Sequence, residues 1–323
     1  MRKLYLHIGP AKTGTSAIQH ALRAHDDTVV LYPKIDLWAD GAHHNLVFNF
    51  FEIYLRPEMV KRGRAELLAE LSKAFCASDR DIVISSEALF GQVKLDHFVD
   101  TLALLVESPI AVEIIVVCRE HFGRAASQYN QQVKDPVTME RDTPDVYLQR
   151  VAAKITYIPQ LRALRRMGLA VTVIPYEPAA TLVARFLTHV GFPAHCIPVA
   201  AQRNVSMSRK ALIATLAANQ VATDIAARHR YLEALRKMRR FAAPPGFIFG
   251  AEAARRADEY FRIDRQPLAL EFGVALQPPC FHDVGLHLDD AELSEIRAVA
   301  APLGADGEAI VRFASGFLRK QIA

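Results

Sequence analysis

The chain has 323 residues, 51% of them apolar, and a formal net charge of only +4. A chain of this length and composition can bury a complete hydrophobic core, and one large domain is the simplest organisation. The positive charge is spread along the chain, with its densest run at 236–240, which disfavours a nucleic-acid-binding protein because such proteins carry a stronger basic bias.

The cysteines disfavour both a zinc site and a disulfide framework. Cys76, Cys118, Cys196 and Cys280 lie far apart, and no pair has the C-x-x-C spacing of metal or redox motifs. An apolar strand begins directly at the N-terminus, which leaves no room for a signal peptide, and no apolar run reaches membrane-spanning length. We therefore expect a cytoplasmic protein with no membrane span and no nucleic-acid partner.

Apolar runs alternate with helical patterns along the first part of the chain. The runs that predict strands are 4–8, 29–32, 81–85, 111–118 and 169–175. Helical periodicity is clearest at 60–77, 96–106, 145–167 and 179–190. The alternation predicts a three-layer α/β fold, in which a parallel sheet has helices on both faces and binds its ligands at the carboxyl ends of the strands.

Beyond about residue 200 the chain becomes mainly helical. Helices are expected at 208–241, with a break near Asn219, and then at 250–262 and 288–302. We therefore expect a single domain over 1–323, with an α/β core at 1–200 and a helical extension at 201–323 packed on that core. The extension could also pair two copies of the chain in a homodimer.

The most informative segment is LYLHIGPAKTGTS at 4–16, where an apolar strand enters a glycine-bounded turn and then a helix from Ser16 to about Ala24. Backbone N–H groups at a helix N-terminus attract an anion, together with the positive end of the helix dipole. The hydroxyls of Thr13, Thr15 and Ser16 can donate to an oxyanion. Thr15 or Ser16 could instead cap the helix, and the whole segment could be an ordinary strand-to-helix turn.

The two glycines of this turn have the spacing of a Walker A motif, but the residues after them do not fit it. Gly9 and Gly14 frame the loop, and Thr15 and Ser16 follow where a nucleoside triphosphatase carries Lys and then Ser or Thr. The lysine, Lys12, lies inside the loop instead. The loop therefore predicts a site for a phosphate or sulfate ester rather than for Mg·ATP.

The KTGTS run at 12–16 resembles the 5′-phosphosulfate loop of sulfotransferases that use 3′-phosphoadenosine 5′-phosphosulfate (PAPS). The family's 3′-phosphate site is an Arg at a strand end and a Ser about two helical turns later, which Arg119 and Ser127 match after the apolar run 111–118. Considered separately, Arg119 could be a solvated charge at the strand end and Ser127 could be a residue on a helix surface. The resemblance implies a P-loop-type fold, PAPS as the cofactor, adenosine 3′,5′-bisphosphate (PAP) as the product and no metal.

Two further cofactor contacts are implied by the resemblance. Tyr176 and Glu177 follow an apolar strand, as a Tyr-Glu pair does in many sulfotransferases, and Tyr176 would lie near the adenine or simply close the strand end. The R-K-G element of cytosolic animal sulfotransferases has no clear counterpart. The segment 202–210 could supply its function through Arg203.

Sulfuryl transfer would need a cation at the departing phosphate and a base at the acceptor, because its transition state should be loose like that of phosphoryl transfer. Lys12 is the candidate cation. Glu87 follows an apolar strand and resembles the glutamate base of some carbohydrate sulfotransferases. Its carboxylate could instead lie at a helix N-terminus and stabilise that helix through the helix dipole. His44 of the His43–His44 pair is the alternative base, and His7 is expected to be a buried structural histidine.

The function predicted by these residues is PAPS-dependent sulfuryl transfer to a hydroxyl or amine of an acceptor. The resemblance suggests a carbohydrate or a related small molecule, but a phenol, a steroid-like alcohol or an amine would fit the same motifs. Two alternatives stay open, a P-loop nucleotide kinase and a non-catalytic PAP-binding protein of the same fold.

Overall fold

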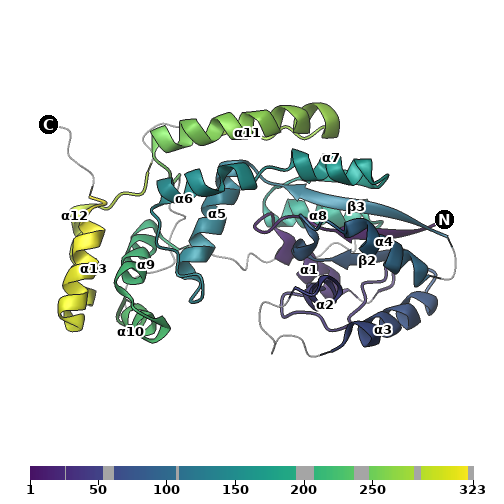
Figure 1. Ribbon diagram of the computed structural model, residues 1–323, viewed down its shortest axis with the longest axis horizontal. Coiled ribbons are helices and arrows are strands. Elements are labelled where there is room, and N and C mark those ends of the chain that lie inside the picture. Colours follow the sequence, from purple (N-terminus) through teal and green to yellow (C-terminus); the bar gives the residue numbers. More distant parts are fainter. Residues whose placement is uncertain are drawn as a thin grey trace. The chain divides into compact units, whose positions relative to one another are not determined.

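The computed structural model describes residues 1–25, 27–53, 62–106, 109–193, 207–235, 247–279 and 285–318 (Figure 1). The chain divides into two compact units. The sheet unit comprises Met1–Glu120, Tyr157–Arg203 and Asp264–Gln277, and the helical unit comprises His121–Thr156, Asn204–Ile263 and Pro278–Ala323. Residues 121–156, assigned from sequence to the α/β core, thus group with the helical unit, and the organisation as one domain stays a prediction.

The sheet unit is built on a four-stranded, all-parallel sheet flanked by helices, as the sequence predicts. Its strands are β1 (Arg2–His7), β2 (Ile82–Ser85), β3 (Ile110–Cys118) and β4 (Ala170–Pro175). They pair in the order β2-β1-β3-β4, and Leu4 of β1 is in register with Ile82 of β2 and with Val112 of β3. All four strands therefore end at the same edge of the sheet.

The prediction of a strand at 29–32 is wrong. Leu31 makes only an isolated parallel bridge with Ile82. The next backbone N–H, that of Tyr32, donates 3.1 Å to the Asp27 carboxylate instead of to a neighbouring strand, and Pro33 then has no N–H to donate. The apolar run therefore lies beside β2 without becoming a strand of the sheet.

Side chains that alternate along the strands build two separate apolar layers. Leu4 and Leu6 pack with α3 (Arg64–Cys76), α4 (Leu95–Leu104) and α7 (Ile158–Arg166), whereas Tyr5 packs with α1 (Thr15–Ala24) and α8 (Ala179–His189). Alternation with a period of two is what sends neighbouring residues of a strand to opposite faces. The sheet unit thus has the three layers predicted from the sequence.

The helix expected at 145–167 is interrupted, because α6 (Pro144–Val151) and a 3-10 turn, η3 (Ala152–Lys154), precede a new helix, α7, at Ile158. Pro159 lies in the first turn of α7, where its missing N–H is tolerated, but it could not continue a helix from upstream. The backbone N–H groups of Tyr157 and Ile158 donate to the Asp264 carboxylate at 2.7–3.0 Å. This contact, between residues more than a hundred positions apart, stabilises the start of α7.

The helical unit contains α5 (His121–Lys134), α6, α9 (Arg209–Val221), α10 (Ile225–Leu235), α12 (Asp290–Ala300) and α13 (Ala305–Ser315) around one apolar core. The break expected near Asn219 falls between α9 and α10. The helix expected at 250–262 is longer than predicted, since α11 (Ala251–Phe272) continues through Pro267. Within the part of the chain that the structure describes, no helix is long and apolar enough to cross a lipid bilayer.

Candidate functional site

The glycine-bounded loop joins β1 to α1, and two of its residues have left-handed backbones. Gly14, at the N-cap of α1, has φ +86°, and a Cβ there would lie 2.4 Å from Leu182 Cδ2. Only glycine fits this position, and α1 has no side-chain cap. Lys12 has φ +71°, which is uncommon for a residue with a side chain and typical of strained functional loops.

The three hydroxyl residues of the loop differ in their accessibility. Thr13 is fully buried, and its hydroxyl donates to the Pro10 carbonyl at 2.7 Å, so in this structure that hydroxyl closes the loop on itself. Thr15 is also buried, whereas Ser16 is half-buried at the first turn of α1. Ser16 is thus the most accessible hydroxyl for an anion, and assigning all three to the cofactor stays a prediction.

Arg119 follows β3 and lies against the same loop. Its Nη1 donates to the Lys12 carbonyl at 3.1 Å, and its guanidinium stacks over the Tyr176 ring with 4.6 Å to the centroid. The backbone N–H of Arg119 donates to the Tyr157 hydroxyl at 3.1 Å, and that hydroxyl donates to the Arg119 carbonyl at 2.7 Å. A Cβ on Gly14 would lie 3.3 Å from the Tyr176 ring. Four of the site residues predicted from the sequence therefore lie next to one another: Lys12, Gly14, Arg119 and Tyr176.

The charges of this cluster favour an anion. Burial lowers the pKa of Lys12, Glu87 acts against this shift, and Arg119 lowers the pKa further. Two cations that are partly removed from water and repel each other are stabilised by a bound negative group. A phosphate or sulfate ester would supply that group.

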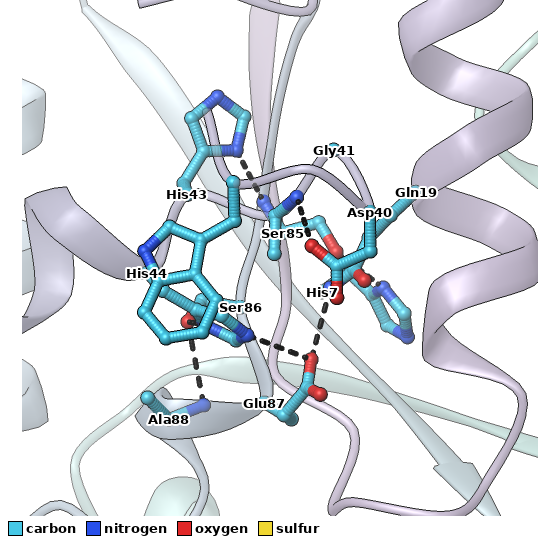
Figure 2. Close-up of polar contacts among 12 residues, drawn as sticks. His7, Gln19, Asp40, Gly41, His43, His44, Ser85, Ser86, Glu87 and Ala88 are labelled. Atoms are coloured by element: carbon cyan, nitrogen blue, oxygen red, sulfur yellow. Dashed lines mark hydrogen bonds and ion pairs between the residues drawn. The ribbon is translucent and has the colours of Figure 1, made fainter. Parts of the chain in front are cut away.

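Glu87 opens the 3-10 turn η2 (Glu87–Leu89) just after β2, and polar side chains surround it (Figure 2). Gln19 Nε2 donates to Glu87 Oε2 at 3.0 Å, and His44 Nε2 lies 3.6 Å from the same oxygen. His44 Nδ1 is 2.7 Å from Ser86 Oγ, which also accepts from the Ala88 N–H. The two residues proposed as alternative bases, Glu87 and His44, are thus direct neighbours.

His43 has a structural environment that sets it apart from His44. Its Nε2 is 2.8 Å from the Pro33 carbonyl, and its Nδ1 is 3.2 Å from the Ser85 backbone N–H. Because the carbonyl needs a donor and the N–H needs an acceptor, the neutral ring carries its proton on Nε2. Burial lowers the pKa of His43 to about 4, so this ring stays neutral and holds its loop against β2.

His7, at the end of β1, is fully buried beneath the loop. Its Nδ1 lies 2.8 Å from Ser85 Oγ, and a Cβ on Gly9 would lie 3.2 Å from its Nε2. Among the residues that the structure describes, Nε2 has no hydrogen-bond partner. Burial lowers the pKa of His7 from 6.5 to about 3, which fits the structural role expected from the sequence.

His7→Asn is expected to flatten the acid dependence of stability. Below pH 6.5 the unfolded chain binds a proton at His7 that the folded protein rejects down to about pH 3. The free energy of unfolding therefore falls as the pH drops through this window, by about 1.4 kcal/mol per unit from this group. Asn keeps a polar atom for Ser85 but does not titrate. In urea unfolding, the free energy of unfolding of the wild type should exceed that of His7→Asn by less at pH 4.5 than at pH 7. An equal difference at the two pH values would contradict the conclusion that His7 is buried and neutral.

The structure does not test two of the predicted cofactor residues. Ser127 lies half-buried on α5, which belongs to the helical unit. Arg203 lies outside the described residues. A 3′-phosphate site made by Arg119 with Ser127 or Arg203 therefore stays a prediction.

Gln19 and Asp40 lie at the candidate site, and the sequence analysis missed both of them. Gln19 lies on the face of α1 that Ile18 and Leu22 bury, and a polar residue on an apolar helix face was the available signal. Asp40 lies four residues before His44, and one ligand atom from each of Asp40, His44 and Glu87 lies within 4.8 Å of the others. No local pattern links Asp40 with Glu87, because their contact depends on the fold.

No protein-family model matches this chain, and no curated protein matches it. The structure itself defines the class, a parallel α/β protein whose four strands each end at a candidate site residue. The glycine-bounded loop follows β1, Glu87 follows β2, Arg119 follows β3 and Tyr176 follows β4. The carboxyl ends of parallel strands are where such sheets bind their ligands.

Proposed function

We propose that the protein is a sulfotransferase that moves the sulfuryl group of PAPS to a hydroxyl or amine of a small molecule, with a carbohydrate as the preferred acceptor. The observation that carries the proposal is the gathering of Lys12, Arg119 and Glu87 at the carboxyl ends of three adjacent parallel strands. Two cations suit an anionic cofactor, and a nearby carboxylate suits an acceptor that must lose a proton.

The residues present fit an ester of phosphate or sulfate. The N-terminus of α1 has no side-chain cap, and Lys12 and Arg119 add two charged donors beside it. The cradle is tight because Gly14 leaves no space for a side chain next to Leu182 and Tyr176. PAPS would supply the activated sulfuryl group, and Lys12 would stabilise the charge that develops on the departing phosphate.

Glu87 would accept the proton of the acceptor as its oxygen forms the new bond to sulfur and the bond from sulfur to the 5′-phosphate oxygen breaks. Gln19 already donates to Oε2 and holds the carboxylate in place, and His44 lies 3.6 Å from the same oxygen. A carboxylate has lone pairs on both oxygens, which leaves Oε1 for the acceptor. Ser86 in turn orients His44 through Nδ1.

Calorimetric titration with PAP, and with Mg·ATP as the comparison, tests the proposed cofactor. We expect tight binding of PAP in the presence of a chelator and much weaker binding of ATP. Tight binding of Mg·ATP without a response to PAP would replace the proposal with a P-loop kinase. Binding of PAP without turnover on any of a panel of saccharide, phenol and amine acceptors would indicate a non-catalytic PAP-binding protein.

Lys12→Met should lower kcat by about a hundredfold or more while changing PAP affinity by less than about tenfold. The reason is that the ammonium matters most when charge builds on the leaving phosphate. Methionine keeps the length of the side chain and has the same difficulty at φ +71°, so the backbone strain is matched. The exposed Lys94→Met is the control in the same unit. A loss confined to PAP affinity would make Lys12 a binding residue only.

A further inference from the structure

Asp40, His44 and Glu87 converge at the carboxyl end of β2 (Figure 2), and one ligand atom from each lies within 4.8 Å of the other two. His44 is 6% exposed, and the two carboxylates are half-buried. We propose that these three side chains bind a divalent cation of the zinc class. The binding site does not depend on the sulfotransferase reaction, although it shares Glu87 and His44 with the proposed machinery.

The environment of His44 is that of a metal ligand. Its Nδ1 is held by Ser86 Oγ at 2.7 Å, which leaves Nε2 facing the carboxylates. Ligating histidines usually donate their second ring N–H to an oxygen in this way. The 3.6 Å between His44 Nε2 and Glu87 Oε2 is long for a hydrogen bond. It is close to the separation of about 3.4 Å between two ligands of a tetrahedral ion with bonds of about 2.1 Å.

Gln19 gives an independent indication of a ligand at this place. The side chain is fully buried, its Nε2 donates to Glu87 Oε2 at 3.0 Å, and its Oε1 has no hydrogen-bond partner within the described part of the chain. An unmatched buried acceptor costs free energy. A water molecule on a cation next to Glu87 is a strong donor and would satisfy this oxygen.

The loop that carries Asp40 is held in place before any ligand binds. The Ala42 N–H donates to Asp40 Oδ1 at 3.2 Å, and Gly41 has φ +94°. A Cβ on Gly41 would lie 2.8 Å from the Gln19 carbonyl, so this loop packs closely against α1. Two carboxylates brought this close repel each other, and a cation between them would remove that repulsion.

The donor set selects the type of cation. One imidazole and two carboxylates suit zinc and related first-row ions, whereas Mg²⁺ prefers oxygen ligands alone and keeps most of its water. Three protein ligands leave one position of a tetrahedral ion open. If the proposed function holds, a cation on Glu87 also occupies the base, so zinc should inhibit transfer reversibly.

The test uses chelator-treated full-length protein titrated with Co²⁺ and with Zn²⁺ in the absence of any nucleotide. We expect one equivalent of Co²⁺ to produce the intense visible absorption of a four-coordinate site, and Zn²⁺ to abolish it while excess Mg²⁺ does not. Asp40→Asn and His44→Gln should each weaken Zn²⁺ binding by at least about tenfold. Asp40→Asn keeps the acceptor for the Ala42 N–H, and Asp96→Asn and His20→Gln are matched controls outside the cluster.

Zn²⁺ affinity unchanged in both Asp40→Asn and His44→Gln would overturn the site. The cobalt spectrum of the wild-type protein tests the site even where a variant does not fold, because the weak absorption of hydrated Co²⁺ would also overturn it. Thermal unfolding with chelator shows whether each variant is folded. Since PAP is absent from these titrations, a failed cation site leaves the proposed function untouched, and failure to bind PAP leaves the cation site untouched.

Discussion

Glu87→Gln is expected to remove sulfuryl transfer and to leave PAP binding unchanged. A general base typically contributes about 10²–10⁴ in rate, and an amide cannot take the proton of the acceptor. The substitution preserves shape, and the amide oxygen of the new side chain can still accept from Gln19 Nε2. The measurement is turnover with PAPS and a responsive acceptor, together with PAP calorimetry on the same preparation.

This experiment needs two controls. Glu66→Gln removes an exposed carboxylate of the same unit and should retain full activity. A chelator in every assay keeps a cation from occupying Glu87, so that any lost rate reflects proton transfer alone. An active Glu87→Gln enzyme would move the base to His44, and His44→Gln would then have to show the larger loss.

The sequence predicted the sheet well because buried parallel strands are continuous apolar runs. Four of the five runs form strands, and β3, an interior strand of the sheet, has five fully buried residues in succession from Ile114 to Cys118. The fifth run, which includes Leu31, does not form a strand because a side-chain acceptor and a proline interrupt the backbone pairing. The Tyr32 N–H donates to the Asp27 carboxylate, and the apolar pattern of a sequence does not show that such a side-chain hydrogen bond will replace a backbone one.

Helix boundaries depended on contacts distant in sequence. The only local sign that a helix starts at Ile158 is Pro159, the next residue, because the acceptor for the first N–H groups of α7 is the distant Asp264. The apolar pattern of 145–167 predicted a single helical stretch. The structure has two helices there, and the contact with Asp264 stabilises the start of the second.

Most residues of the candidate site that the sequence predicted directly follow strands, and His44, which the sequence also predicted, lies on α2 (His44–Phe51) beside Glu87. Lys12, Glu87, Arg119 and Tyr176 were found because parallel strands bring their carboxyl ends to one edge. His43 and His44 are adjacent in sequence, and only their surroundings separate them, since a carbonyl and a backbone N–H occupy both nitrogens of His43.

Arg119→Ala is expected to weaken PAP binding by about 30-fold to several thousandfold, because a desolvated phosphate would lose its paired cation. The structure gives Arg119 a second task, since its guanidinium also donates to the Lys12 carbonyl and stacks on Tyr176. The two tasks separate when PAP is compared with adenosine 5′-phosphate, which lacks the 3′-phosphate. If Arg119 binds the 3′-phosphate, the variant should bind both nucleotides equally weakly, and its affinity for adenosine 5′-phosphate should match that of the wild type.

Arg119→Lys and Arg166→Ala complete the comparison. Lysine keeps the charge but cannot present the planar fork, so it should recover only part of the PAP affinity. Arg166, an exposed residue at the end of α7, should be replaceable without effect. An equal loss for both nucleotides in Arg119→Ala would mean that Arg119 braces the loop at Lys12, and the 3′-phosphate would then need a different cation. Retained PAP affinity would remove Arg119 from the cofactor site altogether.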